Sequence, residues 1–194
     1  YGTQFGGLVN FIIKLPNPNK PFEFITRNTL GSNRLYTNFT SISGTKKKWT
    51  YYSFFNYKKG DGFRSNSEFE SKNVYAHIGY QIKKDTKISG EITYLNYLAQ
   101  QAGGLSDQMF NANPFQSNRA RNWFQVDWLL YNLKFAHKFS ENTNFTFSAF
   151  GLNASRYALG FRTNRVDQID PLQERDLIKG DFNNFGFEAR ILNK

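Results

Sequence analysis

Hydrophobic and polar residues alternate with a period of two along several segments of the chain. Over Asn73–Ile82, valine, alanine, isoleucine and tyrosine fall on one face and mostly polar residues fall on the other. Lys87–Tyr94 and Phe185–Leu192 repeat the pattern. This period indicates β-strands with one apolar face. Phe22–Gly44 alternates poorly, and Trp123–Phe139 is partly apolar on both faces, which predicts a β-bulge or a different register there.

The pattern predicts about eight strands joined as consecutive hairpins, most of them as long as the roughly 9–11 residues that a tilted membrane strand needs. A tight loop near Gly31–Arg34 joins the first two. The predicted strands are Phe22–Leu30, Leu35–Gly44, Trp49–Lys58, Lys72–Ile82, Lys87–Leu98, Trp123–Phe139, Asn144–Ser155 and Phe185–Leu192.

The later joints between these strands alternate between short and long. The short ones are Thr45–Lys48, Lys83–Thr86 and Ser140–Thr143, and the long ones are Lys59–Ser71, Ala99–Asn122 and Arg156–Asn184. Outer-membrane barrels have short periplasmic turns and long extracellular loops. We therefore predict an all-β fold, an antiparallel transmembrane β-barrel portion. The alternative is a soluble β-sheet binding or adhesion module, because strand alternation alone fits both.

Composition agrees with a barrel wall. Aromatic residues make up 18% of the 194 residues, with 21 Phe and 11 Tyr, and such residues favour strands and form the aromatic girdles of membrane barrels. The chain has no apolar run of the roughly 18 residues that a transmembrane helix requires. Its mean hydropathy of −0.61 is compatible with polar loops and a polar lumen.

Charge and residue content exclude several kinds of chemistry. Cysteine is absent and the only histidines are His77 and His137, which disfavours a thiolate or histidine metal site, and no pattern indicates catalysis. The formal net charge is +10. This excess predicts either a basic surface that contacts anionic lipid or lipopolysaccharide, or arginines that recruit an anionic substrate. Nucleic acid is disfavoured, because the basic residues do not form one continuous cluster.

The segment Tyr1–Lys14 resembles the end of the plug domain in TonB-dependent outer-membrane receptors. Its matching elements are Tyr1-Gly2, Gly6-Gly7 and the apolar run Val9–Ile13, and the proline-containing linker Leu15–Pro21 follows. The resemblance implies that residues 1–21 are the C-terminal end of a plug domain with its linker. It also implies that residues 22–194 are the N-terminal part of a transmembrane barrel of about 22 strands.

Two further segments resemble the ferric citrate receptors of that family. Ala99–Phe124 carries Gly104-Leu105-Ser106, Asn113-Pro114 and Gln116–Arg119, and the later segment carries Arg175–Leu177 and Gly180–Phe182. The resemblance implies an outer-membrane active transporter of a Gram-negative bacterium, energised by the TonB complex through a plug region that this sequence does not contain. Ferric citrate is the expected cargo, with another siderophore, haem, cobalamin or a glycan as alternatives.

Arginines concentrate where this cargo is expected to arrive. Ferric citrate is anionic, and the arginine fork binds carboxylates in a bidentate manner. Six of the ten arginines lie in the second and third predicted long joints, whereas lysines occupy the short turns. By resemblance, the expected ligand-binding residues are Arg119, Arg121, Arg162 and Arg165, with Gln4 from the plug-like segment. The alternative is that loop arginines pair with nearby carboxylates and order the loops. No resident cofactor is expected.

Overall fold

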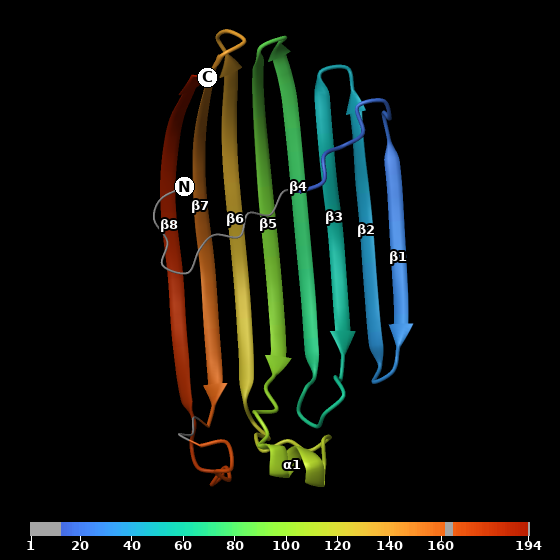
Figure 1. Cartoon of the computed structure of the whole chain (residues 1–194), viewed down its shortest axis with the longest axis vertical. Helices are drawn as coiled ribbons and strands as arrows, with labels where there is room; N and C mark the ends of the chain where they lie inside the picture. The colour runs from blue at the N-terminus through green and yellow to red at the C-terminus, as the bar shows by residue number, and fades with distance from the viewer. Residues whose placement is uncertain (1–12, 162–164, 194) are drawn as a thin grey trace.

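The computed structural model describes residues 13–161 and 165–193, and its strands form one open antiparallel sheet of eight in sequence order (Figure 1). The strands are β1 (Glu23–Gly31), β2 (Leu35–Lys46), β3 (Trp49–Gly60), β4 (Phe69–Lys83), β5 (Thr86–Gln100), β6 (Trp123–Lys138), β7 (Thr143–Gly160) and β8 (Asp176–Asn193). The predicted all-β class and the number of strands are confirmed. Within the described ranges, no helix is long and apolar enough to cross a membrane.

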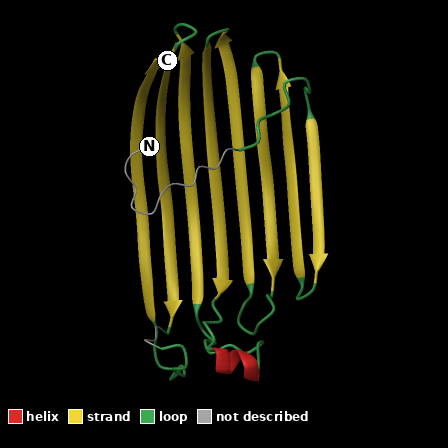
Figure 2. Ribbon diagram, viewed as in Figure 1, coloured by secondary structure: helices red, strands yellow, loops and turns green. Residues whose placement is uncertain are grey.

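The short and the long connections between strands lie at opposite ends of the sheet, as predicted (Figure 2). The β2–β3, β4–β5 and β6–β7 turns lie at the upper end in this view, called the short-turn edge here. The three long joints lie at the opposite long-loop edge, where the helix α1 (Asp107–Ala112) interrupts the second of them. The tight β1–β2 turn also lies there. Three residues separate the paired Gly31 and Leu35, and two of them, Asn33 (55°) and Arg34 (52°), have the positive φ of a type I′ turn.

The third long joint is shorter than predicted. β7 continues to Gly160 and β8 begins at Asp176, so Arg156 and Gly180–Phe182 belong to strands and the predicted limits Arg156–Asn184 are wrong. The reason is that these outer parts of the strands carry polar or charged side chains and glycine, which in sequence are typical of a loop. The pairing Arg156↔Gly180 shows that the ladder continues through them.

The strand β6 is regular along its whole length. It pairs continuously with β5 and with β7, and the one register shift in the sheet falls instead between Gln81 and Lys83 of β4. The hypothesis of a bulge within Trp123–Phe139 is therefore wrong. Apolar residues such as Val126 and Leu130 occupy one face of β6, and Leu129 and Leu133 occupy the other, so the alternation is weak although the strand is straight.

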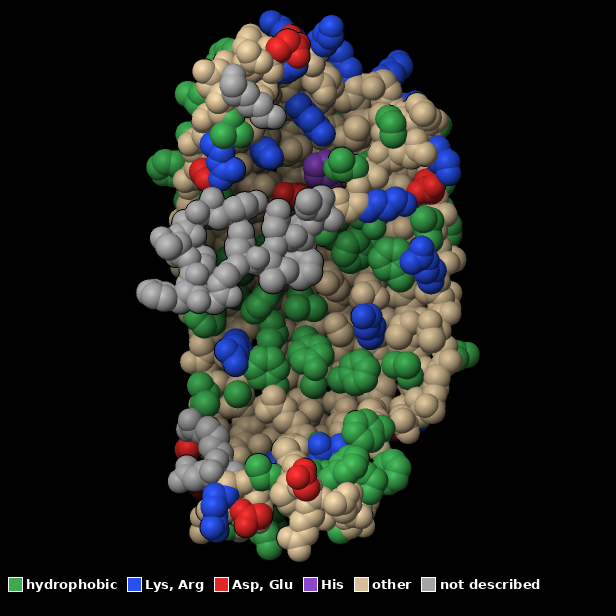
Figure 3. Space-filling view, in the orientation of Figure 1, with side chains coloured by type: hydrophobic (Ala, Val, Ile, Leu, Met, Phe, Trp, Pro, Cys, Tyr) green, Lys and Arg blue, Asp and Glu red, His purple; other side chains and the backbone are tan. Residues whose placement is uncertain are grey.

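One face of the sheet, called the inner face here, is hollowed and is crossed by the segment that precedes β1 (Figures 1 and 3). Ile13 and Leu15 of this segment line hollows on that face. Two large aromatic side chains are buried on the same face: Tyr52 and Tyr75 are 7% and 4% exposed and pack around Phe54. The inner face thus holds the aromatic core of this wall.

The opposite, outer face divides into apolar and polar rows. Residues that pair across neighbouring strands point to the same face, so they form lateral rows. Three rows near the short-turn edge, the outer apolar rows, contain Trp49–Tyr80–Ile88–Phe135–Phe147–Ala189, Tyr51–Ile78–Gly90–Leu133–Ala149–Phe187 and Ser53–Ala76–Ile92–Tyr131–Gly151–Phe185. Large members are exposed, including Ile78 and Leu133 at 53% each and Phe187 at 73%.

Nearer the long-loop edge, the outer face becomes polar. The outer polar rows are Tyr57–Lys72–Asn96–Asp127–Ser155–Asp181 and Lys59–Glu70–Leu98–Gln125–Tyr157–Lys179. Their side chains bond to one another: Asn96 donates to Asp127 at 3.0 Å, and Tyr157 donates to Asp181 at 3.0 Å. On β4 the apolar outer residues that the register places run from Val74 to Tyr80, which spans about 20 Å along the strand.

Candidate ligand-binding site at the long-loop edge

The first and second long loops are held together by Arg64. Its guanidinium donates hydrogen bonds to the carbonyl oxygens of Gln116 (3.0 Å), Gly103 (2.9 Å) and Ala102 (3.4 Å). The backbone N–H of Ser65 donates to Phe115 O at 3.1 Å. A loop of more than 20 residues between β5 and β6 would be mobile if unsupported. Arg64 therefore acts as a bridge that fixes the second loop against the first.

The second loop is in turn tied to the third. Asn118 donates to Val166 O at 2.5 Å, and Arg119 Nη1 donates to Gln168 O at 2.9 Å. At the base of the loops, Asn122 accepts from Phe161 N at 2.9 Å and donates to Phe161 O at 3.3 Å. The three long loops thus form one connected roof over the end of the wall.

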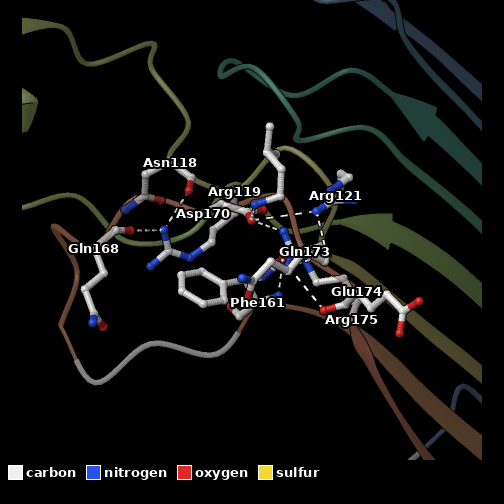
Figure 4. Close-up of polar contacts among 11 residues, drawn as sticks. Asn118, Arg119, Arg121, Phe161, Gln168, Asp170, Gln173, Glu174 and Arg175 are labelled. Carbon is white, nitrogen blue, oxygen red and sulfur yellow. Dashed lines mark hydrogen bonds and ion pairs between the residues drawn. The ribbon is translucent and has the colours of Figure 1, made fainter.

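Two guanidinium groups lie against one buried carboxylate in this roof, and a third lies on the neighbouring Phe161 ring (Figure 4). Asp170, 9% exposed, forms an ion pair with Arg175 and lies 3.8 Å from Arg121 Nη2. Arg119 and Arg175 both lie over the ring of Phe161, each 5.4 Å from its centroid. Burial, with a smaller effect of the positive Arg121, lowers the pKa of Arg175. Arg121, the exposed cation of this group, lies 3.8 Å from a carboxylate that already pairs with Arg175, so its guanidinium can also contact an anionic ligand.

The predicted arginines have different environments. Arg119 is 5% exposed and directs its guanidinium to backbone carbonyls. Arg121 keeps 44% of its side chain exposed while donating to Gln173 O at 2.9 Å. Arg165 is 75% exposed and lies 3.6 Å from Asp167. Gln4 and Arg162 lie outside the described residues. The structure therefore brings Arg119 and Arg121 into one cluster, with Arg121 as its accessible member.

The sequence-based alternative, that loop arginines pair with nearby carboxylates, describes two contacts in this roof. Asp170 pairs with Arg175, and Arg165 lies 3.6 Å from Asp167. Sequence reasoning did not assign Arg175 or Phe161 to the site and did not predict that Arg64 of the first loop supports it. Arg156, expected in the third long joint, lies in β7 with its guanidinium 5.1 Å from the ring centroid of Phe124.

Comparisons with known proteins bear on the fold. No family model and no curated protein matches the chain. The arrangement of strands matches a portion of a β-barrel. A solved structure with this arrangement is the ferric citrate transporter FecA in its unliganded form, which is 18% identical with a TM-score of 0.79. The match covers 98% of this chain and 29% of that chain, so this chain spans less than a third of the FecA chain. FecA is a transporter and not an enzyme.

Proposed function

We propose that this chain is part of the wall of a TonB-dependent outer-membrane transporter for an anionic iron chelate, ferric citrate foremost. The proposal rests on how the outer face is divided. From β3 to β8, the apolar rows lie toward the short-turn edge and the polar rows lie toward the long-loop edge. Exposed large apolar rows on one side of a sheet need an apolar environment. At a tilt of about 40°, the paired apolar length of β4 gives a height of roughly 15 Å, which fits within the ~25 Å apolar band of outer-membrane barrels.

In this proposal, the short-turn edge lies on the periplasmic side and the long-loop edge lies outside the cell. Residues 1–21 are the end of the plug with its linker, and residues 22–194 are the first part of the barrel wall. The roof of loops receives the chelate: Arg121 and Arg165 contact it, Arg162 and Gln4 contribute from the third loop and the plug, and Arg119 holds the roof in shape. The outer polar rows contact the head groups of lipid and lipopolysaccharide.

The exposed guanidinium groups of Arg121 and Arg165 at the roof favour an anionic chelate over a neutral cargo. Uptake of iron-55 supplied as ferric citrate is the direct test, in cells with and without the gene for the intact protein. Uptake that requires both the gene and a working TonB complex is the expected result. Uptake of haem, cobalamin, a glycan or another siderophore in place of ferric citrate would keep the transporter class and reject this cargo.

The alternative of a soluble β-sheet module has a separate test. The intact protein is expected in the outer-membrane fraction, to need detergent for extraction, and to migrate differently on gels before and after heating. Recovery from the soluble fraction, with no heat-dependent change in migration, would reject the membrane part of the proposal.

A further inference from the structure

Five exposed lysines gather in the β2–β3 and β4–β5 turns at the short-turn edge. This group, called the lysine rim here, consists of Lys46, Lys47, Lys48, Lys83 and Lys84. Figure 3 shows lysine or arginine side chains at this upper end of the molecule. The same two turns contain one acidic residue, Asp85. The lysine rim therefore carries a strong local excess of positive charge.

Hydrogen bonds hold the two turns in place. Lys48 Nζ donates to Ile82 O at 3.0 Å, and the backbone N–H of Gln81 donates to Lys48 O at 2.8 Å, so the first turn is tied to the end of β4. The side chain of Gln81 donates to the carbonyl oxygens of Lys83 (2.7 Å) and Lys84 (3.3 Å) in the second turn. The lysine side chains therefore extend from fixed positions of the backbone.

The register places the lysine rim directly beside the outer apolar rows. Lys46 pairs with Trp49, which begins the apolar row nearest the turns. In this row the rings of Trp49 and Tyr80 pack with their centroids 4.5 Å apart. Lys83 pairs with Thr86, one row further toward the short-turn edge. Along the strands toward this edge, the outer face therefore changes from apolar and aromatic side chains to lysines.

This order of side chains matches the order of environments at the surface of a bilayer. Apolar side chains suit the hydrocarbon region, and tryptophan and tyrosine are enriched at the level of the head groups. A lysine places its carbon chain along apolar surface and its ammonium group in the polar region beyond. Anionic head groups attract lysines that lie near the membrane surface.

The lysine rim is not neutralised by the acidic residues that the structure describes. Among these residues, no carboxylate lies within 4.0 Å of any rim lysine. The third short turn differs, because its Glu141 pairs with Lys138 at 2.7 Å. Positive charge on this edge is therefore concentrated in the first two turns.

The opposite end of the outer face has balanced charge. The outer polar rows contain three lysines and three carboxylates. Two of these residues, Lys72 and Glu70, pair at 2.7 Å. The outer face thus distinguishes its two ends: it is balanced in the polar rows and positive at the lysine rim.

We propose that the lysine rim binds the phosphate groups of anionic phospholipids such as phosphatidylglycerol. This rests on the proposed function, because a bilayer has to cover the outer apolar rows; the lipids are then those of the periplasmic leaflet. An ammonium group binds a phosphodiester as a point charge. Because the rim adjoins Trp49 and the apolar rows, it suits a ligand with an apolar part beside its phosphate. A phospholipid has both parts, whereas an acidic protein surface has only the charge.

Photo-crosslinking with two matched lipids tests this on the intact protein in phosphatidylcholine vesicles. The probes are phosphatidylglycerol and phosphatidylcholine, each with a diazirine on an acyl chain close to the glycerol, so that they differ only in the head group. Mass spectrometry locates the labelled peptides. A head group that contacts one lysine is expected to label the rim about fivefold more as phosphatidylglycerol than as phosphatidylcholine. Equal labelling by the two lipids is expected around Lys72, where the charge is balanced.

Two double variants with the same change of net charge separate the rim from the overall charge of the protein. Lys46→Gln with Lys83→Gln removes the two rim lysines that the register places on the outer face, and is expected to lower the preference to less than about twofold. The matched control is Lys87→Gln with Lys134→Gln, which lie on the inner face. In the control the preference is expected to persist. Added salt is expected to reduce the preference, because it screens exposed charges.

Equal labelling of the rim by the two lipids, or a preference that survives in Lys46→Gln with Lys83→Gln, would overturn the binding of anionic phospholipid. Failure of the proposed membrane wall has a different signature, because neither lipid would then label peptides from the outer face, and both proposals would be rejected. The labelling does not depend on iron uptake. A failed uptake assay would therefore count against the proposed cargo alone.

Discussion

Replacing Arg64 by alanine is predicted to release the roof of loops while leaving the sheet intact. Arg64 is half-buried and donates three hydrogen bonds to carbonyl oxygens of the second loop, at 2.9–3.4 Å. Bonds from a charged donor contribute roughly 1.5–3 kcal/mol each. We assign about 1 kcal/mol to each of the three hydrogen bonds, because water replaces part of each interaction when the bond opens. The total of about 3 kcal/mol corresponds to an increase of about 150-fold in local opening.

Hydrogen exchange measured by mass spectrometry on the intact protein is the assay. The amide of Ser65, which donates to Phe115 O, and peptides from 101 to 118 are expected to exchange faster in Arg64→Ala, whereas peptides from the middle of β4 and β5 keep their rates. Arg64→Lys is expected to behave nearly like the alanine variant, because an ammonium group cannot reach three carbonyls with the geometry of the fork.

The matched control is Arg34→Ala on the same edge. Arg34 is 79% exposed and pairs with Asp61 at 2.5 Å, and an exposed ion pair is screened by solvent. No measurable change in exchange of the second loop is expected. Equal exchange in Arg64→Ala and the unmodified protein, or an equal effect of Arg34→Ala, would refute the reasoning that Arg64 bridges the loops.

Three further predictions concern the rows, the site and a turn. Ile78→Arg places a charge in an outer apolar row and is expected to cost about 2–4 kcal/mol of folding free energy in bilayers. Gln125→Arg, in an outer polar row, is expected to change the folding free energy little. Equal urea midpoints for the two variants would contradict this prediction. Arg119→Ala with Arg121→Ala is expected to weaken ferric citrate binding more than about tenfold by titration calorimetry, because the charged contact of Arg121 is lost and the loops that Arg119 holds together are released. Unchanged affinity would remove both residues from the site. Lys138 donates to Glu141 at 2.7 Å and lowers the pKa of that carboxyl. The ion pair therefore stabilises the turn at pH values above the ordinary pKa of glutamate, and this stabilisation is lost as the pH falls through the lowered pKa. Lys138→Met is expected to raise the pKa of Glu141 in an NMR titration, and an unshifted titration would contradict the assignment.

Much of the wall was predictable because the strands that cross the apolar zone alternate clearly. Val74, Ile78 and Tyr80 were predicted to share a face, and the register places them together on the outer face. The limits of β7 and β8 were not predictable in the same way. Beyond the outer apolar rows both faces are polar, so Asp181 in a paired strand has the same sequence character as a loop residue.

The contacts of the loop cluster could not be read from sequence. Arg64 and Arg119 donate to backbone carbonyls 38 to 52 positions away, and a carbonyl acceptor has no residue-type signature. The concentration of arginine in the loops was visible, but not which arginine is buried as a bridge and which is exposed. Burial of Arg119 against Phe161 depends on three loops meeting, and this is a tertiary property.

Electron paramagnetic resonance of single spin labels tests the central claim most directly, that the outer apolar rows face lipid. This chain has no native cysteine, so labels can be placed at Ile78→Cys and Leu133→Cys in the apolar rows, and at Lys72→Cys and Asp127→Cys in the polar rows. In bilayers, the first pair is predicted to collide mainly with oxygen and the second pair mainly with a water-soluble nickel chelate. Nickel accessibility that is equally high at all four positions would contradict the membrane-facing wall.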